Sequence, residues 1–312
     1  MTTMHRVQVD SWSEGPRYVA VDRPPTPGAD ELQLRVLAAG VHNVVRSRAS
    51  GKHYSANQLP HVPGVDCVAQ DEATGQLYYC SKITPDFGTF ADYINIGKAN
   101  AVPLPAHVDP ISFAGSYNPC MSSWMAITQR TSNLPENYSV LIIGATSASG
   151  RMAVNVAKTL GAGKITGMAR NADTLAQVDG LDHRIVQASS VQDTDLSQLE
   201  CDLILDYVYG DVVLHVLSSL KRGKPVQYVQ IGGLGQTEIS LPSAILRSTD
   251  ITIRGAGPGS WSMKGAQTEM PKLAKAMGEW KLLGAEALPM KDIEQIWGDR
   301  SLAAAGRLVL KP

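Results

Sequence analysis

The stretch VLIIGATSASGRMAVNVAKTLGAGKITGMARN, residues 140–171, decides the fold of this chain. It opens with a short apolar run (140–144) that has the length and composition of a strand inside a parallel sheet. A turn of small residues follows, and apolar residues at helical spacing then run to a glycine-rich end that stops the helix. The next segment, KITGMAR, has the pattern of a second strand. The stretch therefore predicts a strand, a tight turn, a helix and a second strand.

The turn of this unit departs from the usual glycine pattern of dinucleotide-binding proteins. The pattern GxGxxG would place glycines at 145, 147 and 150, where the chain has Ala145, Ser147 and Gly150. Gly150 suits close packing of helix on strand, whereas the Ser147 side chain either crowds a pyrophosphate or donates a hydrogen bond to it. Free N–H groups at a helix start suit a pyrophosphate. The predicted cofactor-binding residues here are Ala145, Thr146, Ser147, Ala148, Ser149 and Gly150. The alternative is a tight turn that binds no ligand.

The end of the second strand favours NADPH over NADH. NAD-specific sites place a carboxylate there, but this strand runs into Arg170 and Asn171, and the first carboxylate is Asp173. The guanidinium of Arg170 can pair with a 2′-phosphate. We therefore predict Arg170 and Asn171 as cofactor-binding residues. The alternative is that Arg170 is a solvated residue at a helix start.

Strand and helix patterns continue to alternate up to about residue 257. The predicted strands lie at 183–188, 201–208, 225–233 and 251–257, and the predicted helices at 171–180 and 211–223. Alternating units of this length predict an α/β fold with a doubly wound parallel sheet.

The two ends of the chain have a different pattern. The first third contains short strand patterns separated by Gly and Pro, which predicts an antiparallel, barrel-like unit. The tail reads as two helices and a terminal strand, GRLVLKP, which we expect to pack on the N-terminal unit. We predict two domains, one of them discontinuous: 1–118 with 263–312, and 119–262.

Composition narrows the class of partner. The formal net charge is −1, so no strong field points to nucleic acid or to a membrane surface. The N-terminus lacks the pattern of a signal peptide, and no apolar run reaches the length of a membrane span. These observations predict a cytoplasmic protein with a small-molecule partner. The four cysteines form no CxxC pair, which predicts buried free thiols.

Several segments together resemble a known family. They are RSRASGKHY, LPHVPGVDCVA, FGTFADYINI, NPCMSSWMAITQR, the run from 144 to 162, and the closing GRLVLKP. These segments span almost the whole chain. Through them the chain resembles the zinc-independent, quinone oxidoreductase-like (enoyl reductase-like) branch of the medium-chain dehydrogenase/reductase superfamily. The resemblance implies a GroES-like β-rich catalytic domain, a Rossmann domain, a nicotinamide facing a pocket built by the N-terminal half, and a homodimer.

The resemblance also implies a reaction without metal. Zinc-dependent relatives carry Gly-His-Glu where this chain has Gly64, Val65 and Asp66, and the segment GVHNVVRSR lacks their first cysteine ligand. We therefore expect no metal site.

A donor near the substrate carbonyl would then stabilise the charge that hydride transfer creates. Tyr54 is the first candidate, because a tyrosine near this place lies by the nicotinamide in similar reductases; His42 and His53 are the others. Each has an ordinary alternative, because a tyrosine or histidine at a loop edge often only packs or caps. Relatives often carry an Asn and Asp pair where this chain has His42 and Val45, which weakens the simple reductase assignment.

Four more positions complete the predicted cofactor site. Ser122 aligns with a Ser or Thr that contacts the nicotinamide or its ribose, with helix capping as the alternative. Tyr207, Gly232 and Gly233 follow predicted strands at the edge of the sheet where open α/β proteins bind ligands. For these three, a purely structural role in the turns is the alternative.

Three functions follow from these residues. The first is NADPH-dependent hydride transfer to a quinone or an α,β-unsaturated carbonyl compound. The second is a redox-neutral isomerisation or cyclisation on the same fold, suggested by Ser147 and by the missing polar pair. The third is a non-catalytic protein that senses the cofactor. The second and third predict tight NADPH binding without NADPH consumption, which separates them from the first.

Overall fold

The computed structural model describes residues 2–53, 55–82, 84, 87–299, 302 and 307–312. The chain divides into two compact units, Met1–Asn118 with Met270–Pro312 and Pro119–Glu269. The chain crosses from one unit to the other twice, within α2 (Pro110–Arg130) and within α7 (Met263–Met277). The sequence predicted the second boundary between residues 262 and 263, at the start of α7.

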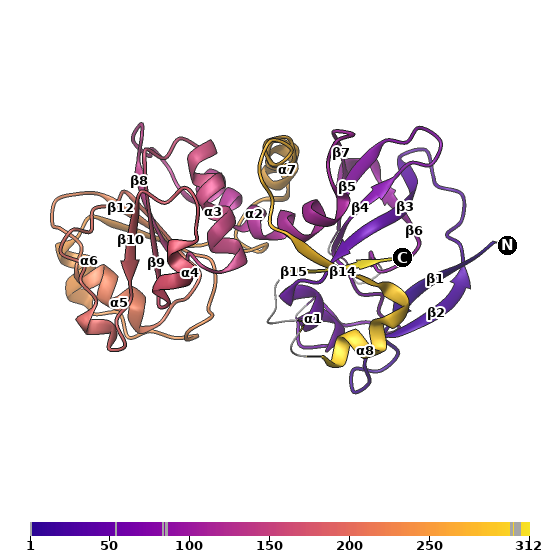
Figure 1. Ribbon diagram of the computed structural model, residues 1–312, viewed down its shortest axis with the longest axis horizontal. Helices are drawn as coiled ribbons and strands as arrows, with labels where there is room; N and C mark the ends of the chain where they lie inside the picture. The colour runs from indigo at the N-terminus through magenta and orange to yellow at the C-terminus, as the bar shows by residue number, and fades with distance from the viewer. Residues whose placement is uncertain (1, 54, 83, 85–86, 300–301, 303–306) are drawn as a thin grey trace. The chain divides into compact units, whose positions relative to one another are not determined.

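The second unit contains the predicted parallel sheet (Figure 1). Its strands are β8 (Ser139–Ile143), β9 (Lys164–Ala169), β10 (His183–Val186), β11 (Leu203–Asp206), β12 (Val226–Gln230) and β13 (Ile251–Gly255). They lie in the order β10-β9-β8-β11-β12-β13, and every neighbouring pair is parallel. The chain reverses its winding direction between β8 and β11, which is where ligands bind in open sheets of this kind.

Helices and a buried core hold this sheet. The connecting elements are α3 (Ala148–Thr159), α4 (Ala172–Ala176), the 3-10 turn η2 (Val191–Asp193), α5 (Asp211–Ser218) and α6 (Ser243–Ser248). Leu141 and Ile143 of β8 pack with Ile204 of β11 and Val213 of α5, all at most 1% exposed. Burial of each such side chain contributes about 1.5–3 kcal/mol. The continuous apolar composition of β8 thus reflects a strand covered on both faces.

Local sequence explains where α3 begins and ends. Ser147 precedes the helix, and its hydroxyl accepts from the Gly150 N–H at 3.0 Å. Gly161 follows the helix with φ +93°, and the next amide, Ala162 N–H, bonds to the Ala157 carbonyl at 2.9 Å. This is the left-handed glycine stop that the sequence predicted.

The first unit is built mainly of antiparallel strands. They are β1 (Thr3–Gln8), β2 (Arg17–Asp22), β3 (Glu31–Gly40), β4 (Asp66–Gln70), β5 (Leu77–Ser81), β6 (Tyr93–Gly97), β7 (Ala101–Leu104), β14 (Ala285–Pro289) and β15 (Arg307–Lys311). Seven form one sheet in the order β14-β15-β3-β4-β5-β7, with β6 on β3, while β1 and β2 pair separately. Because β15 pairs with β3, the C-terminal tail packs on the N-terminal strands.

Short helices complete the first unit. They are α1 (Asn43–Ala49), η1 (Lys98–Asn100), η3 (Met290–Asp292) and α8 (Ile293–Gly298). The sequence predicted no helix at α1, where Val45 and Ala49 are buried. One short turn of amphipathic helix gives too few periods to recognise.

Helix α2 begins at Pro110, eleven residues before MSSWMAITQR (121–130), the segment that has helical spacing in the sequence. Pro119, in its interior, has no N–H to donate to the carbonyl four residues earlier. The Arg307 Nε fills that gap by donating to the Gly115 carbonyl at 2.8 Å. The helix continues through the proline because a distant residue satisfies its open acceptor.

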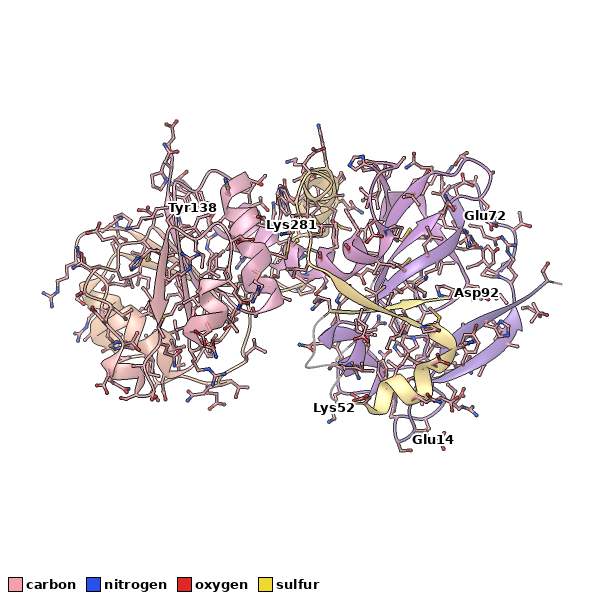
Figure 2. The ribbon with its side chains drawn as sticks, in the orientation of Figure 1. Glu14, Lys52, Glu72, Asp92, Tyr138 and Lys281 are labelled. Carbon is pink, nitrogen blue, oxygen red and sulfur yellow. The ribbon has the colours of Figure 1, made fainter. Side chains whose placement is uncertain are left out.

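Two carboxylates labelled in Figure 2 connect elements of the first unit. Asp92 accepts from the His5 N–H at 2.7 Å, and Glu72 lies 3.6 Å from Arg23 and 3.4 Å from Arg35. The four cysteines are buried and form no disulfide, as predicted. None of the helices described is long and apolar enough to cross a bilayer.

Candidate cofactor site

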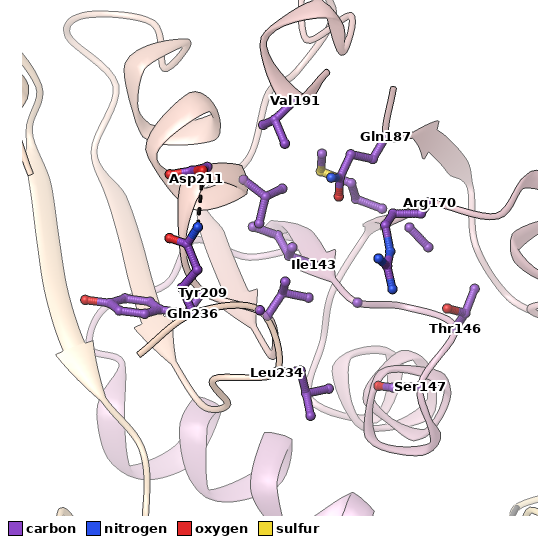
Figure 3. Close-up of a pocket in the computed structure, with 16 residues that line it drawn as sticks. Ile143, Thr146, Ser147, Arg170, Gln187, Val191, Tyr209, Asp211, Leu234 and Gln236 are labelled. Carbon is purple, nitrogen blue, oxygen red and sulfur yellow. Dashed lines mark hydrogen bonds between the residues drawn. The ribbon is translucent and has the colours of Figure 1, made fainter. Parts of the chain in front are cut away.

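A cavity of about 440 Å³ opens at the carboxyl edge of the parallel sheet (Figure 3). Loops after five successive strands line it. Its residues are Ile143, Gly144, Thr146, Ser147, Met168, Ala169, Arg170, Gln187, Val191, Val208, Tyr209, Asp211, Val212, Leu234, Gly235 and Gln236. The cavity therefore lies at the place where the winding direction reverses.

The start of α3 forms one wall. Thr146 and Ser147 line the cavity, and the Thr146 carbonyl accepts from Arg151 Nε at 3.1 Å. The Ser147 oxygen is turned to the Gly150 N–H, so the side chain caps the helix. Its hydroxyl proton can still be donated to an anion. This geometry favours the donating role of Ser147 over the crowding role.

Gly150 allows the turn to approach the helix closely. A Cβ atom at Gly150 would overlap the Gly144 carbonyl oxygen and lie 2.7 Å from the Ala145 Cα. Ala145 itself is fully buried, and Ala148, Ser149 and Gly150 are not lining residues of the cavity. These residues shape the backbone of the site, while Thr146 and Ser147 face it.

Arg170 follows β9 directly and lines the cavity on the side of the start of α3 (Figure 3). It is exposed, and its guanidinium is directed to the side where Thr146 lies (Figure 3). No hydrogen bond or ion pair with Arg170 is found among the residues that the structure describes. Asn171 is not a lining residue: its side chain caps α4 by accepting from the Thr174 N–H at 2.9 Å. The wall thus presents one uncompensated cation to a ligand.

A buried carboxylate shapes the loop after β11. Asp206 is fully buried, and it accepts from the Val208 N–H at 2.8 Å and from the Tyr209 N–H at 3.0 Å. Tyr209, with φ +64°, is in the left-handed region, and the Tyr228 hydroxyl donates to the other Asp206 oxygen at 2.8 Å. Burial raises the pKa of Asp206. Since Val208 and Tyr209 line the cavity, Asp206 positions one of its walls.

We expect Asp206→Leu to weaken both the fold and NADPH binding. Leucine has no acceptor for the N–H groups of Val208 and Tyr209, and a lost acceptor for buried donors costs roughly 2 kcal/mol. The free energy of unfolding in urea and the Kd for NADPH measure the two effects. Tyr228→Phe is the matched control, because it removes one donor to the same carboxylate and leaves both loop bonds. Equal effects of the two variants on NADPH affinity would contradict the positioning role.

The other predicted cofactor residues do not line this cavity. The Ser122 hydroxyl donates to the Pro119 carbonyl at 2.7 Å within α2, so it does not cap a helix start. Tyr207 is 4% exposed, and Gly232 packs on its carbonyl, where a Cβ would come within 2.6 Å. Gly233 lines a second cavity, of about 630 Å³, beside β12 and β13. Their contacts with a cofactor stay predictions.

His42 lies in a buried polar network of the first unit. It is 3% exposed, its Nε2 lies 3.0 Å from Asp66 Oδ1, and its Nδ1 accepts from the Arg307 guanidinium. Because the Arg307 guanidinium can only donate, the His42 Nδ1 that accepts from it carries no proton. The single N–H of the neutral ring is therefore on Nε2. Asp66 also accepts from the Tyr79 hydroxyl at 2.8 Å, and Tyr79 stacks on Tyr117. One of these bonds must break before His42 can donate to a substrate, so its catalytic role stays a prediction.

The remaining catalytic candidates lie just after α1. The His53 Nδ1 lies 2.8 Å from the Ser55 hydroxyl and accepts from the Ser55 N–H at 3.2 Å. Burial, with a smaller contribution from the charge of Arg48, lowers the pKa of His53. Tyr54 lies outside the described residues. The part of the chain that is described holds no group of three His, Cys, Asp or Glu residues suited to a metal ion. Independence from metal stays a prediction.

Sequence reasoning missed the far wall of the cavity. The missed polar residues are Gln187, Tyr209, Asp211 and Gln236, of which Gln236 donates to Asp211 at 3.2 Å (Figure 3). Gln187 lies near the end of a predicted strand and the other three follow predicted strands at the carboxyl edge, which is the signal that could have found them.

Comparisons with known proteins agree with this arrangement. No family model matches the chain. The chain is 34% identical over 358 residues to the probable NADPH-dependent quinone reductase tdiC of Emericella nidulans, covering 99% of this chain and 100% of that protein. It is 31% identical over 149 residues to the trans-enoyl reductase tndF of Aspergillus flavipes, covering 45% of this chain and 36% of that protein.

Solved structures show the same fold. The quinone oxidoreductase of Thermus thermophilus, also solved in complex with NADPH, has a TM-score of 0.76 at 23% identity, covering 99% of this chain and 100% of that one. The structure of AibC has a TM-score of 0.84 at 18% identity, covering 99% and 96%. The predicted fold class, a GroES-like β-rich domain with a Rossmann domain, is confirmed.

Proposed function

Because the chain belongs to the quinone reductase-like branch of the medium-chain dehydrogenase/reductase superfamily, we propose that it is an NADPH-dependent oxidoreductase. Its reaction is hydride transfer to a quinone or an α,β-unsaturated carbonyl compound. One observation carries the proposal: the cavity at the sheet's switch point is lined both by a capped helix start and by Arg170. The whole-length similarity to a probable NADPH-dependent quinone reductase supports it.

The residues of this cavity fit NADPH. The first turn of α3 offers N–H groups and the positive end of the helix to a pyrophosphate, and the Ser147 hydroxyl adds a donor. Arg170 supplies the cation for a 2′-phosphate. NADPH, when bound, supplies the hydride. The chain binds and orients it, and we propose that the proton comes from water or from Tyr54, which the structure does not describe.

The proposal includes a reaction that needs no metal. Asp66 stands where zinc-dependent relatives carry glutamate, and both its oxygens are engaged by His42 and Tyr79. Arg307 brings a positive charge to the same network. A cation that entered here would displace these bonds and meet that charge, which supports the metal-free reading. We expect dialysis against a chelator to leave NADPH oxidation unchanged.

The test of the proposed function is NADPH binding followed by turnover. Titration with NADPH and NADH, by calorimetry, is expected to show tighter binding of NADPH. Quinones and enones are then screened by loss of the nicotinamide absorbance. If NADPH binds tightly but is not oxidised in the presence of any acceptor, a redox-neutral reaction is favoured instead. Absence of binding would contradict the proposal altogether.

Ser147→Asp tests where the pyrophosphate lies. Aspartate caps a helix as well as serine, so the fold should remain intact. A carboxylate about 4 Å from the diphosphate would cost roughly 1–4 kcal/mol, so we expect NADPH to bind at least about tenfold more weakly. Ser147→Asn is the control: it is the neutral isostere of aspartate, it caps a helix as well as serine and its amide can donate to the diphosphate, so it should bind NADPH within about threefold of the wild type. Unchanged affinity in Ser147→Asp would place the pyrophosphate elsewhere.

We further propose a cytoplasmic homodimer that pairs through β13. This strand is at the end of the sheet, and Ile253 on it is a large apolar residue that is 42% exposed. An uncovered edge strand is a template for pairing with another chain. We expect Ile253→Lys to convert a dimer into a monomer in sedimentation velocity. A wild-type monomer, or a dimer that survives this change, would contradict the proposal.

A further inference from the structure

Arg48 is a buried cation whose donors are mostly open. It lies in the last turn of α1 and is 0% exposed. One terminal nitrogen, Nη2, donates to the Thr84 carbonyl at 2.7 Å, while Nε and Nη1 have no hydrogen-bond partner. Burial of a charged donor without a partner is unfavourable, because the group loses its hydrogen bonds to water and forms no new ones. A bound ligand that accepts these hydrogen bonds would remove this cost.

Two neighbouring residues have open polar atoms as well. The Thr84 hydroxyl, beside the carbonyl that Arg48 contacts, has no partner, and neither do the two ring nitrogens of His61, which is 1% exposed. Trp12 connects His61 with the helix that carries Arg48. The centroid of its ring lies 5.8 Å from that of the His61 ring, and a Cβ atom added at Gly51, just after α1, would lie 2.8 Å from Trp12 Cγ. The open donors thus belong to one buried region.

The charge state of this region is positive. Burial, and secondly the charge of Arg48, lower the pKa of His61 to about 4, so its ring is neutral at pH 7 and carries one N–H. Among the described residues, no carboxylate forms an ion pair with Arg48. Within the described part of the chain, Arg48 is thus a cation with no carboxylate partner, and Thr84 and His61 supply neutral donors. This set suits an oxyanion.

We propose that Arg48, with His61 and Thr84, binds the carboxylate or an equivalent oxyanion of a small acidic ligand. The region is remote in sequence from the residues of the NADPH cavity. The ligand assignment deepens the proposed function in one respect: if the chain is a reductase, its preferred acceptors carry an acidic group. Binding of the oxyanion itself does not depend on that function.

The first experiment measures binding without turnover. Full-length protein with isotope-labelled histidine rings is titrated with benzoate and with its neutral isostere benzamide. We expect benzoate alone to shift the His61 ring signals in a saturable way, and Arg48→Met to weaken benzoate by at least about tenfold, as loss of a charge-assisted bond implies. Arg48→Lys, which keeps the charge, should retain part of the binding if Arg48→Met fails to fold.

The matched control is Lys52→Met. Lys52 is an exposed cation four residues further along the chain (Figure 2), so its loss should leave benzoate binding unchanged. The proposal is overturned if benzoate does not bind, if benzamide binds equally well, or if Arg48→Met binds benzoate like the wild type.

A second arm connects the site to the acceptor. The enone trans-3-benzoylacrylate and its methyl ester differ only in the carboxylate. We expect Arg48→Met to raise KM for the acid at least about tenfold and to leave KM for the ester unchanged. If neither compound oxidises NADPH while benzoate still binds through Arg48, the proposed function fails and the oxyanion site stands. If both are reduced and Arg48→Met affects them equally, the preference for acidic acceptors is wrong and the reductase stands.

Discussion

Arg170→Ala is expected to lower the affinity for NADPH by about 30-fold and to leave the affinity for NADH nearly unchanged. The guanidinium lines the cavity beside the start of α3, and no partner among the described residues neutralises it. Hydrogen bonds between charged groups contribute about 1.5–3 kcal/mol, and 2 kcal/mol corresponds to roughly a 30-fold change in Kd. Calorimetric titration of both cofactors measures the change in preference.

Arg170→Lys separates charge from geometry in the same assay. A lysine keeps the charge but lacks the planar fork of donors that suits a phosphate. We expect it to bind NADPH with an affinity between those of the wild type and Arg170→Ala. If Arg170→Ala weakened NADPH and NADH by the same factor, Arg170 would contact a part shared by both cofactors, and the assignment to the 2′-phosphate would be wrong.

Gly150→Ala is expected to destabilise the second unit by about 3 kcal/mol, the upper part of the usual range for overpacking. In an ordinary helix position the same change would be stabilising, since alanine has the higher helix propensity. Here the added Cβ overlaps the Gly144 carbonyl and approaches the Ala145 Cα, which are backbone atoms that cannot rotate away. The start of α3 must move, so we also expect NADPH to bind at least about tenfold more weakly.

Gly259→Ala provides the control for this prediction. Gly259 belongs to the same unit, and no heavy atom lies within 4 Å of the position where its Cβ would be. Thermal or urea unfolding should therefore show little change for Gly259→Ala and a large loss for Gly150→Ala. Equal stabilities of the two variants would show that the turn yields, and the close approach would then not explain why a glycine stands at 150.

The fold was predictable where the pattern is long and regular. The apolar β8, the α3 helix with its glycine end and the following strands are local patterns, and their order alone specifies a doubly wound sheet. The short α1 and the early start of α2 were not predictable. Pro119 argues for a helix boundary in sequence, and only Arg307, from the far end of the chain, supplies the donor that allows the helix to continue.

The candidate site was predictable only in part. Thr146, Ser147 and Arg170 line the cavity as expected because they follow the first two strands of the sheet directly. Asn171 instead caps a helix, and Ser122 bonds to its own helix backbone. A polar residue at a loop can satisfy the backbone or face a ligand, and sequence pattern does not distinguish the two.

The sequence by itself determined the class of fold, the place of the small-residue turn that leads into α3, and the cation at the end of the second strand. These depend on residues within one βαβ unit, where local geometry follows from the order of side chains. Only the tertiary structure decided that Asp206 holds the loop after β11 and that His42 lies between Asp66 and Arg307. The tertiary structure alone also shows that Arg48 is buried with two nitrogens, Nε and Nη1, that have no hydrogen-bond partner. Such contacts join residues far apart in the chain, and whether a buried polar group finds a partner depends on which distant elements pack against it.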